Sequence, residues 1–222
     1  MNDGTDEYPV VITRKPVRNA RMRVKSDGTV HITAPKGFDT TAFLAEKKDW
    51  ITAHQAEMNR LAERHQTAAD QMLLLGTEYT VREGSHCRTD HSEKVITAPN
   101  PVALRWHLTD EFRALIRESV YAHAEELGVS PGRCTIRMQK TRWGSCSSAG
   151  NLNFNLKLYA LPTHLRDYVV VHELTHLNIL NHSPAFWSAV GAYYPAYKQA
   201  EEELRTYWIG IERSHWWNAL NK

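Results

Sequence analysis

The sequence predicts an α+β fold with an antiparallel, β-rich N-terminal part. Three observations support this prediction. Apolar and polar residues alternate between positions 10 and 34, apolar residues recur at helical spacing over 41–65, and predicted helices and short strands follow one another in the second half of the chain. We expect two domains, residues 1–100 and residues 101–222.

The first domain is expected to open with a small antiparallel sheet. Three short alternating runs lie between residues 10 and 34, and the segment SDGT within them has an Asp-Gly pair suited to a tight hairpin turn. A helix is predicted over about 40–65, with Asp39 and Thr40 as candidate caps. A second cluster of strands is expected between 78 and 98.

The second domain is expected to begin with a helix over about 110–127, which Gly128 is placed to end. Strands are predicted over 134–139 and 151–158, and the second of these alternates cleanly between apolar and polar residues. Proline can occupy the first helical position, so a further helix is predicted over 162–176.

Composition excludes several classes of protein. Among 222 residues, 42% are hydrophobic and 23% are charged, with a net charge of +2, which is ordinary for a soluble globular protein. No apolar run approaches the roughly 20 residues that span a bilayer. The acidic, polar N-terminus is not a secretory signal, and three cysteines are too few for a disulfide framework. We expect a cytoplasmic protein without membrane association.

Three histidines and one glutamate lie within eleven positions of the segment VVVHELTHLNILNHSPAFW, residues 169–187. Residues four apart share one face of a helix, so His172 and His176 can reach the same ion, with Glu173 beside them. Two imidazoles and a third ligand leave one position of a zinc ion open for water, and a carboxylate can take a proton from that water. This spacing is a metalloprotease signature. It predicts one Zn²⁺ ion and a general base at Glu173.

The alternative is a chance match on a surface helix. Residues 168–171, directly before the motif, are almost wholly apolar, which indicates a buried helix. Buried polar groups without partners are costly, and a metal ion would supply a partner. The apolar context therefore favours the metal site.

His182 is the predicted third ligand. It follows His176 by six residues, so the chain must turn between them, and Asn178 or Asn181 can supply a left-handed residue for that turn. Ser183 and the following proline suit the start of another helix, which would hold His182 in a corner. The rival ligand is a glutamate from the run at 201–203, although such runs are more often solvated faces.

The segment RWGSCS is expected to form a turn and an edge strand beside the metal-binding helix. Gly144 allows close approach of another group, and Trp143 supplies a large apolar surface. Asn153 and Asn155 would then face substrate together with Trp143, and free strand groups would pair with an extended peptide. The alternative is a packed core hairpin in which Cys146 is a small buried hydrophobe, and we prefer that interpretation for the cysteine.

The segments TRWGSCSSAGNLNFNLKL (141–158) and VVVHELTHLNILNHSPAFW together resemble the YgjP-type zinc metallopeptidase domain, a relative of the SprT and Wss-like proteases. The N-terminal segments ARMRVKSDGTVHITAPKGF and LLGTEYTV also fit that family. The resemblance implies a zincin-like fold and hydrolysis of peptide or protein substrates. It also implies that His172, His176 and His182 bind zinc and that Glu173 is the general base. No methionine follows residue 138, so the Met-turn of metzincins is missing.

Two weaker signals remain. Residues 14–25 contain six basic residues and no acid, a stripe that suits nucleic-acid phosphates and a SprT-like role. The competing interpretation, favoured by the low net charge and the lack of a nucleic-acid motif, is a charged face that protects a sheet edge. His86, Cys87 and His91 are close in sequence, but they lack zinc-finger spacing. A structural zinc without catalysis would require a fourth protein ligand.

Overall fold

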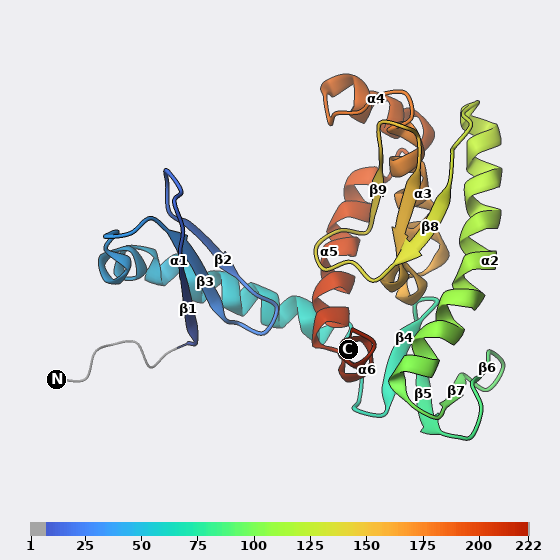
Figure 1. The fold of residues 1–222 in the computed structure, drawn as a ribbon, viewed down its shortest axis with the longest axis horizontal. Helices are drawn as coiled ribbons and strands as arrows, with labels where there is room; N and C mark the ends of the chain where they lie inside the picture. The colour runs from blue at the N-terminus through green and yellow to red at the C-terminus, as the bar shows by residue number, and fades with distance from the viewer. Residues whose placement is uncertain (1–7, 222) are drawn as a thin grey trace. The chain divides into compact units, whose positions relative to one another are not determined.

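The computed structural model describes residues 8–221 and divides into two compact units, one up to Gln66 and one from Thr67 onward (Figure 1). The polar N-terminal segment that argues against a secretory signal falls mostly outside the described residues. Over the described part of the chain, no helix is both long and apolar enough to cross a membrane.

The first unit contains a three-stranded sheet and one helix. The sheet has the order β1-β3-β2, formed by β1 (Val10–Arg14), β2 (Arg21–Val24) and β3 (Val30–Ala34). The β2–β3 hairpin is antiparallel, as predicted, and Gly28 takes the left-handed conformation in its turn. Strand β3 lies between the other two strands. It pairs in parallel with β1 and antiparallel with β2, so β1 and β2 run in opposite directions. The sheet is therefore mixed rather than antiparallel throughout.

Helix α1 (Thr40–Glu63) covers one face of this sheet, with Ile51, Met58 and Leu61 buried. Its predicted cap is confirmed, because the Asp39 carboxylate accepts hydrogen bonds from the backbone N–H groups of the first turn. Val30 and Ile32 of β3 are almost completely buried, whereas Ile12 of β1 is 44% exposed. The alternation in the sequence therefore matches the buried face of the β2–β3 hairpin but not of β1.

The second unit begins with a four-stranded sheet of order β4-β5-β7-β6, formed by β4 (Gln71–Leu74), β5 (Thr77–Glu83), β6 (Arg88–Asp90) and β7 (Val95–Ala98). Side chains of β4, β5 and β7 share one hydrophobic core with the helices that follow. The compact units for that reason divide after residue 66, whereas we expected a boundary near residue 100. We had assigned β4 to β7 to the N-terminal domain because they precede residue 100 in the sequence. Their buried side chains instead belong to the core of the C-terminal helices.

Helix α2 (Pro101–Leu127) starts nine residues earlier than predicted. The Asn100 side chain accepts a hydrogen bond from Ala103 N–H, and Pro101 occupies the first helical turn. This Asn-Pro start signal is visible in the sequence, and the prediction overlooked it. The end was predicted correctly, since Gly128 adopts the left-handed conformation that ends the helix.

A three-stranded sheet of order β8-β10-β9 supports the site, with β8 (Cys134–Arg137), β9 (Gly144–Cys146) and β10 (Leu152–Asn155). β10 pairs in parallel with β8 and antiparallel with β9. The strand predicted over 151–158 ends at Asn155, and a 3₁₀ helix, η1 (Leu156–Ala160), follows. Lys157 was expected on the polar face, but it is buried, forms an ion pair with Glu212 and lies over the Trp208 ring.

The remaining helices are α3 (Thr163–Thr175), α4 (Pro184–Tyr193), α5 (Tyr197–Arg213) and α6 (His215–Ala219). Helix α3 contacts α2, α4, α5 and strand β9, and it lies between α2 and α5 in Figure 1. Its apolar face is completely buried, with Leu165, Val170 and Leu174 in the core. The central position of α3 determines where its polar residues can point.

Candidate active site

Three histidine side chains converge at the C-terminal end of α3. His172 and His176 come from the last turn and the C-cap of this helix, and His182 comes from the segment before α4. Their ligand atoms all lie within 4.8 Å of one another, and the Nε2 atoms of His172 and His182 are 3.0 Å apart. Tetrahedral zinc with bonds of 2.0–2.1 Å places its nitrogen ligands about 3.3 Å apart. The donor set therefore fits a single metal ion.

The chain turns between His176 and His182 without a left-handed residue. Asn178 and Asn181 were candidates for this role, but neither has a positive φ angle, so that prediction was wrong. Tight turns replace it, in which the N–H groups of Asn178 and Ile179 both donate to the Thr175 carbonyl. These turns change the direction of the chain while every φ angle between His176 and His182 stays negative.

The His176 ring is oriented by the same turn. Its Nδ1 atom lies 2.9 Å from the Ile179 carbonyl oxygen, which can only accept, so Nδ1 carries the proton. Nε2 is then the free, unprotonated nitrogen that a metal ion requires. A backbone contact from the connecting turn thus selects the tautomer of a candidate ligand.

Two aromatic residues of the first turn of α4 pack against the histidines. Phe186 is completely buried, and its ring centroid lies 4.5 to 4.9 Å from the centroids of all three imidazoles. Trp187 stacks on His182 at 5.6 Å. Neither ring was predicted to belong to the site, although both lie just after the Ser-Pro helix start beside His182.

The environment of His172 and His176 favours the neutral form of both imidazoles. Burial lowers the pKa of His172 to about 3, and the neighbouring His176 and His182 add to this effect. Burial also lowers the pKa of His176, against the opposing effect of its bond to Ile179. Metal ions bind the neutral imidazole, so the folded chain holds these side chains in the form that a ligand needs.

Glu173 points from α3 toward β9. Its side chain is 6% exposed, and burial raises its pKa to about 7, while Arg142 and the backbone N–H of Cys146 act in the opposite direction. A Cβ atom added to Gly144 would lie only 2.7 Å from the Glu173 Oε1 atom. Gly144 was predicted to allow a close approach, and the group that approaches is this carboxylate.

Strand β9 lies at the edge of its sheet, as predicted for this segment. Backbone bonds join Trp143 to Asn155 and Ser147 to Asn151 on β10, so the groups of Gly144 and Cys146 point to the opposite, outer edge. The Cys146 N–H at this edge donates to Glu173. The outer edge of β9, whose backbone groups pair with no further strand of this sheet, therefore runs beside the carboxylate.

The predicted substrate-facing residues differ in their surroundings. Asn155 is completely buried, and its amide bonds to the Gln139 and Arg142 carbonyls, so its assignment to substrate was wrong. The Asn153 Oδ1 atom accepts a hydrogen bond from the Thr135 hydroxyl. Trp143 is half-buried and packs edge-on against Trp208. The assignments of Asn153 and Trp143 remain predictions.

The chain matches the model of the YgjP-like metallopeptidase domain over residues 18–207. This match covers most of the sequence. The chain belongs to the YgjP-like metallopeptidase family. The segments that carry the resemblance in the sequence are the ones that form α3, β9 and the corner at His182.

Two solved structures are similar to this YgjP-like chain. They are the metallopeptidase zymogens abylysin from Pyrococcus abyssi and jannalysin from Methanocaldococcus jannaschii, with sequence identities of 24% and 22%. The alignments cover 41% and 40% of this chain and 92% of each zymogen chain, with TM-scores of 0.39 and 0.37. No curated protein matches the sequence.

Two of the three rival glutamate ligands of this YgjP-like chain have other partners. Glu201 accepts a hydrogen bond from the Tyr168 hydroxyl, and Glu203 lies 2.8 Å from His164 Nε2. Cys146 is half-buried, and burial together with the Glu173 charge raises its thiol pKa. A thiol with a raised pKa is a poor nucleophile, which agrees with the interpretation of Cys146 as a packing residue.

The basic stripe of residues 14–25 divides into two parts. The Arg14 guanidinium donates to the carbonyls of Pro35 and Phe38, so it holds the entry to α1. Arg21 and Arg23 of β2 are exposed and share one face of the sheet. All six basic residues of the predicted stripe are nevertheless exposed, so the stripe as a whole is presented to solvent.

Proposed function

We propose that this metallopeptidase is zinc-dependent, with His172, His176 and His182 as ligands of one ion and Glu173 as the general base. The observation that carries the proposal is the placement of a buried carboxylate beside three converging imidazoles and against the backbone of β9. Three protein ligands leave the fourth position of a tetrahedral ion open, which is typical of catalytic rather than structural zinc.

Zinc bound in such a site lowers the pKa of a bound water to about 7 and polarises the carbonyl of the scissile bond. The residues of the chain supply the rest of the chemistry. Burial raises the pKa of Glu173 to about 7 in the metal-free chain, which suits a group that accepts and releases a proton near neutral pH. It would take a proton from the attacking water and deliver it to the leaving amine.

The outer edge of β9 offers a way to position the substrate. An extended peptide can pair with unpaired backbone groups of an edge strand, which places its carbonyls at regular intervals along the site. The backbone groups of Gly144 and the carbonyl of Cys146 lie at this edge beside Glu173, whereas the Cys146 N–H already donates to that carboxylate. Substrate contacts at Trp143 and Asn153 belong to this proposal.

The variant Glu173→Gln tests the mechanism. We expect it to bind one equivalent of zinc like the wild type but to hydrolyse peptides about 10²- to 10⁴-fold more slowly, because the amide cannot accept the proton. Zinc content by mass spectrometry and cleavage of a peptide library are the measurements. Full activity of this variant would contradict the mechanism, and zinc binding without hydrolysis by the wild type would indicate a structural metal.

A second candidate function, nucleic-acid association, has one observation in its favour. Residues 8–66 hold eleven Lys and Arg against six Asp and Glu, whereas residues 67–221 hold fifteen against sixteen. The positive charge is therefore concentrated in the first unit, where Arg21 and Arg23 are exposed. Affinity for an oligonucleotide should fall steeply with salt and weaken in Arg21→Gln/Arg23→Gln. Absence of binding at low salt would exclude this function.

A further inference from the structure

A group of cations lies at the end of the β8-β10-β9 sheet where β9 begins. Arg137 ends β8 and pairs with Asn155, and Lys140 and Arg142 follow in the connection to β9. All three side chains are exposed, and no acidic residue occurs between positions 133 and 147. We propose that Arg137, Lys140 and Arg142, termed here the cationic rim, select acidic peptide substrates.

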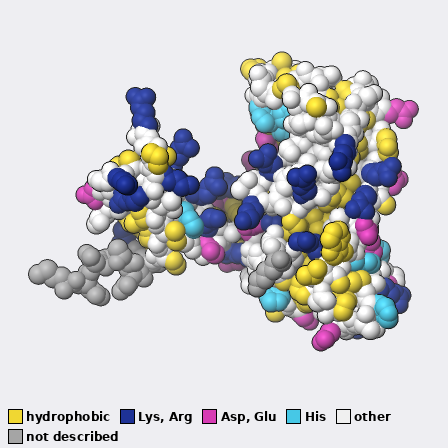
Figure 2. All heavy atoms as spheres, viewed as in Figure 1, with side chains coloured by type: hydrophobic (Ala, Val, Ile, Leu, Met, Phe, Trp, Pro, Cys, Tyr) yellow, Lys and Arg dark blue, Asp and Glu magenta, His cyan; other side chains and the backbone are white. Residues whose placement is uncertain are grey.

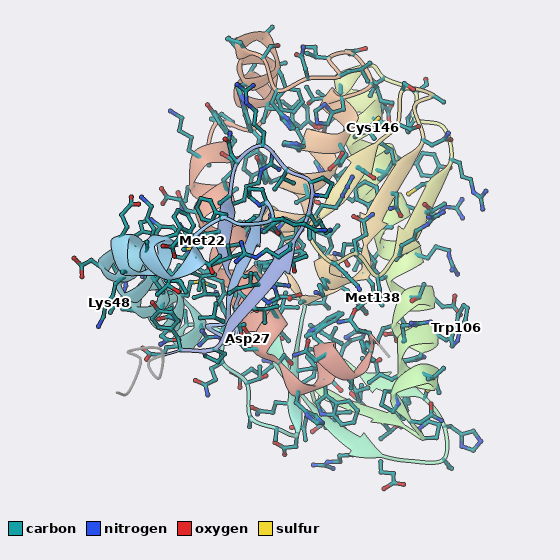
Figure 3. All side chains as sticks on the ribbon, turned by 60° about the vertical axis from the view of Figure 1, so that its left-hand side comes forward. Met22, Asp27, Lys48, Trp106, Met138 and Cys146 are labelled. Atoms are coloured by element: carbon teal, nitrogen blue, oxygen red, sulfur yellow. The ribbon has the colours of Figure 1, made fainter. Side chains whose placement is uncertain are left out.

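This proposal rests on the proposed peptidase function and names its substrate class. The cationic rim is at the same end of the sheet as the start of β9, because β9 runs antiparallel to β10 while β8 runs parallel to it. Figure 3 shows this arrangement, with Met138 and Cys146 at opposite ends of the sheet. A peptide paired with the outer edge of β9 would therefore have one end beside the rim.

The backbone that carries the rim is rigidly held. The buried Asn155 side chain accepts a bond from Gln139 N–H and donates to the carbonyls of Gln139 and Arg142. Its own N–H donates to the Trp143 carbonyl, and the Trp143 ring packs edge-on against Trp208. Because the loop is fixed at several points, binding to its side chains does not first require the backbone to be ordered.

The rim lies close to the reacting groups. Arg142 is two residues from Gly144, whose backbone is in contact with the Glu173 carboxylate. The charge of Arg142 acts on that carboxylate. A substrate carboxylate near Arg142 would therefore lie within a few residues of the scissile bond.

The charges of the rim are not neutralised within the described part of the chain. None of the three cations forms an ion pair there, in contrast to Lys157, which is paired with Glu212. Figure 2 shows lysine and arginine side chains gathered on the face of the second unit that carries β8 and β9. Exposed cations of one sign favour a partner of the opposite sign and disfavour cationic partners.

The test uses three matched peptides that differ only in having Glu, Gln or Lys at two positions on either side of the cleaved bond, all with amidated ends. We expect kcat/KM to decrease in the order Glu, Gln, Lys, with at least a tenfold difference between the first and the last. The preference should shrink at high salt, because salt screens exposed charges. A free C-terminus on the Gln peptide tests whether the terminal carboxylate, rather than a side chain, is recognised.

The variants Lys140→Gln and Arg142→Gln should reduce the preference for the Glu peptide several-fold. Arg133→Gln is the matched control, since Arg133 is exposed but precedes β8 at the opposite end of the sheet, and it should leave the preference unchanged. Equal cleavage of all three peptides, or equal effects of the Arg133 and Arg142 variants, would overturn the proposal.

Binding separates this proposal from the proposed function. Fluorescence anisotropy of a labelled Glu peptide with Glu173→Gln, loaded with zinc, reports recognition without hydrolysis. Binding that weakens in Arg142→Gln supports the rim even if no peptide is cleaved, in which case only the peptidase mechanism fails. If an oligonucleotide displaces the peptide and binds more tightly through Arg142, the partner is a nucleic acid and the proposal is wrong.

Discussion

Two segments of the second unit each contain several residues of metal-binding type, but only one segment brings three of them together. His172, His176 and His182 converge to within 4.8 Å. In the segment 86–91, His86 bonds to the neighbouring Ser85 hydroxyl and His91 bonds to the Tyr79 hydroxyl. Cys87 packs against the hydrophobic core, and burial raises its thiol pKa. Proximity in sequence is therefore a poor guide to a metal site.

The difference lies in what holds each side chain. Helical spacing places His172 and His176 on one face, and the buried Phe186 ring contacts all three imidazoles. The residues of segment 86–91 lie around the short strand β6, where each polar side chain finds its own neighbour. In the segment 172–182, a helix and a buried aromatic ring hold three imidazoles together as a possible metal site. In the segment 86–91, each histidine forms a hydrogen bond with a different neighbour.

Removal of one histidine from each segment tests directly whether only the segment 172–182 binds metal. Loss of a residue that only supports a metal ligand reduces metal affinity by up to about 100-fold. His176 is a proposed ligand itself, so we expect His176→Ala to bind zinc more than about 100-fold more weakly and to lose peptidase activity. His91→Ala should bind one zinc equivalent and remain active. Titration of each purified variant with zinc is the measurement, and zinc loss in His91→Ala would mean that the second segment also holds metal.

Gly144→Ala tests whether the site depends on residues that are not ligands. The added methyl group would meet the Glu173 carboxylate at 2.7 Å and displace it. A displacement near 1 Å can reduce kcat about 100-fold, whereas zinc content should stay at one equivalent. Ser145→Ala on the same strand serves as the control. Unchanged kcat in Gly144→Ala would show that the position of Glu173 is not critical.

Asn155→Ala tests whether the buried amide of Asn155 contributes more to the free energy of unfolding than the half-buried amide of Asn153. It removes a buried amide that bonds to Gln139 and Arg142, which should reduce the free energy of unfolding by about 3 kcal/mol. Asn153→Ala, which loses the bond from Thr135, should cost about 1 kcal/mol. Urea denaturation of both variants measures the difference. Equal losses would contradict the structural role assigned to Asn155.

A further prediction concerns the pH dependence of stability in the metal-free protein. Glu173 has a pKa of about 7 when folded and an ordinary value of 4.5, so its acid form stabilises the fold below pH 4.5 and this contribution is lost as pH rises through 7. His172 acts oppositely, since its pKa is about 3 when folded and 6.5 ordinarily, and stability is lost as pH falls.

Comparison with Glu173→Gln isolates the contribution of Glu173, because His172 is present in both proteins. Relative to this variant, the metal-free wild type should lose about 1.4 kcal/mol of stability per pH unit as pH rises from roughly 4.5 to 7. Urea denaturation in the presence of a chelator at several pH values provides the measurement. Parallel stability curves for the two proteins would indicate that Glu173 is not buried in the acid form.

Several elements could be predicted from local patterns alone. The cap at Asp39, the hairpin turn at Gly28 and the end of α2 at Gly128 each depend on a few neighbouring residues, and each was predicted correctly. The start of α2 was missed because the Asn-Pro signal was overlooked. The strand over 151–158 was predicted too long, because the alternation of its residues continues into a 3₁₀ helix.

The candidate site was predictable in its histidines and not in its surroundings. Spacing placed His172 and His176 on one face, and the Ser-Pro start of α4 placed His182 near them. The same pattern of polar residues placed Asn155 toward substrate, yet its side chain turns inward to bond with a distant loop. A bond of that kind joins residues sixteen and thirteen positions apart, which no periodicity encodes.

By itself, the sequence determined the α+β class, the YgjP-like family and the helix that carries the HExxH residues, because helical geometry relates neighbours along the chain. Only the tertiary structure decided that β9 lies against Glu173, that Phe186 supports the imidazoles and that the 86–91 residues have separate partners. These outcomes depend on which distant surfaces pack together, and packing selects among contacts that the local pattern leaves equally possible.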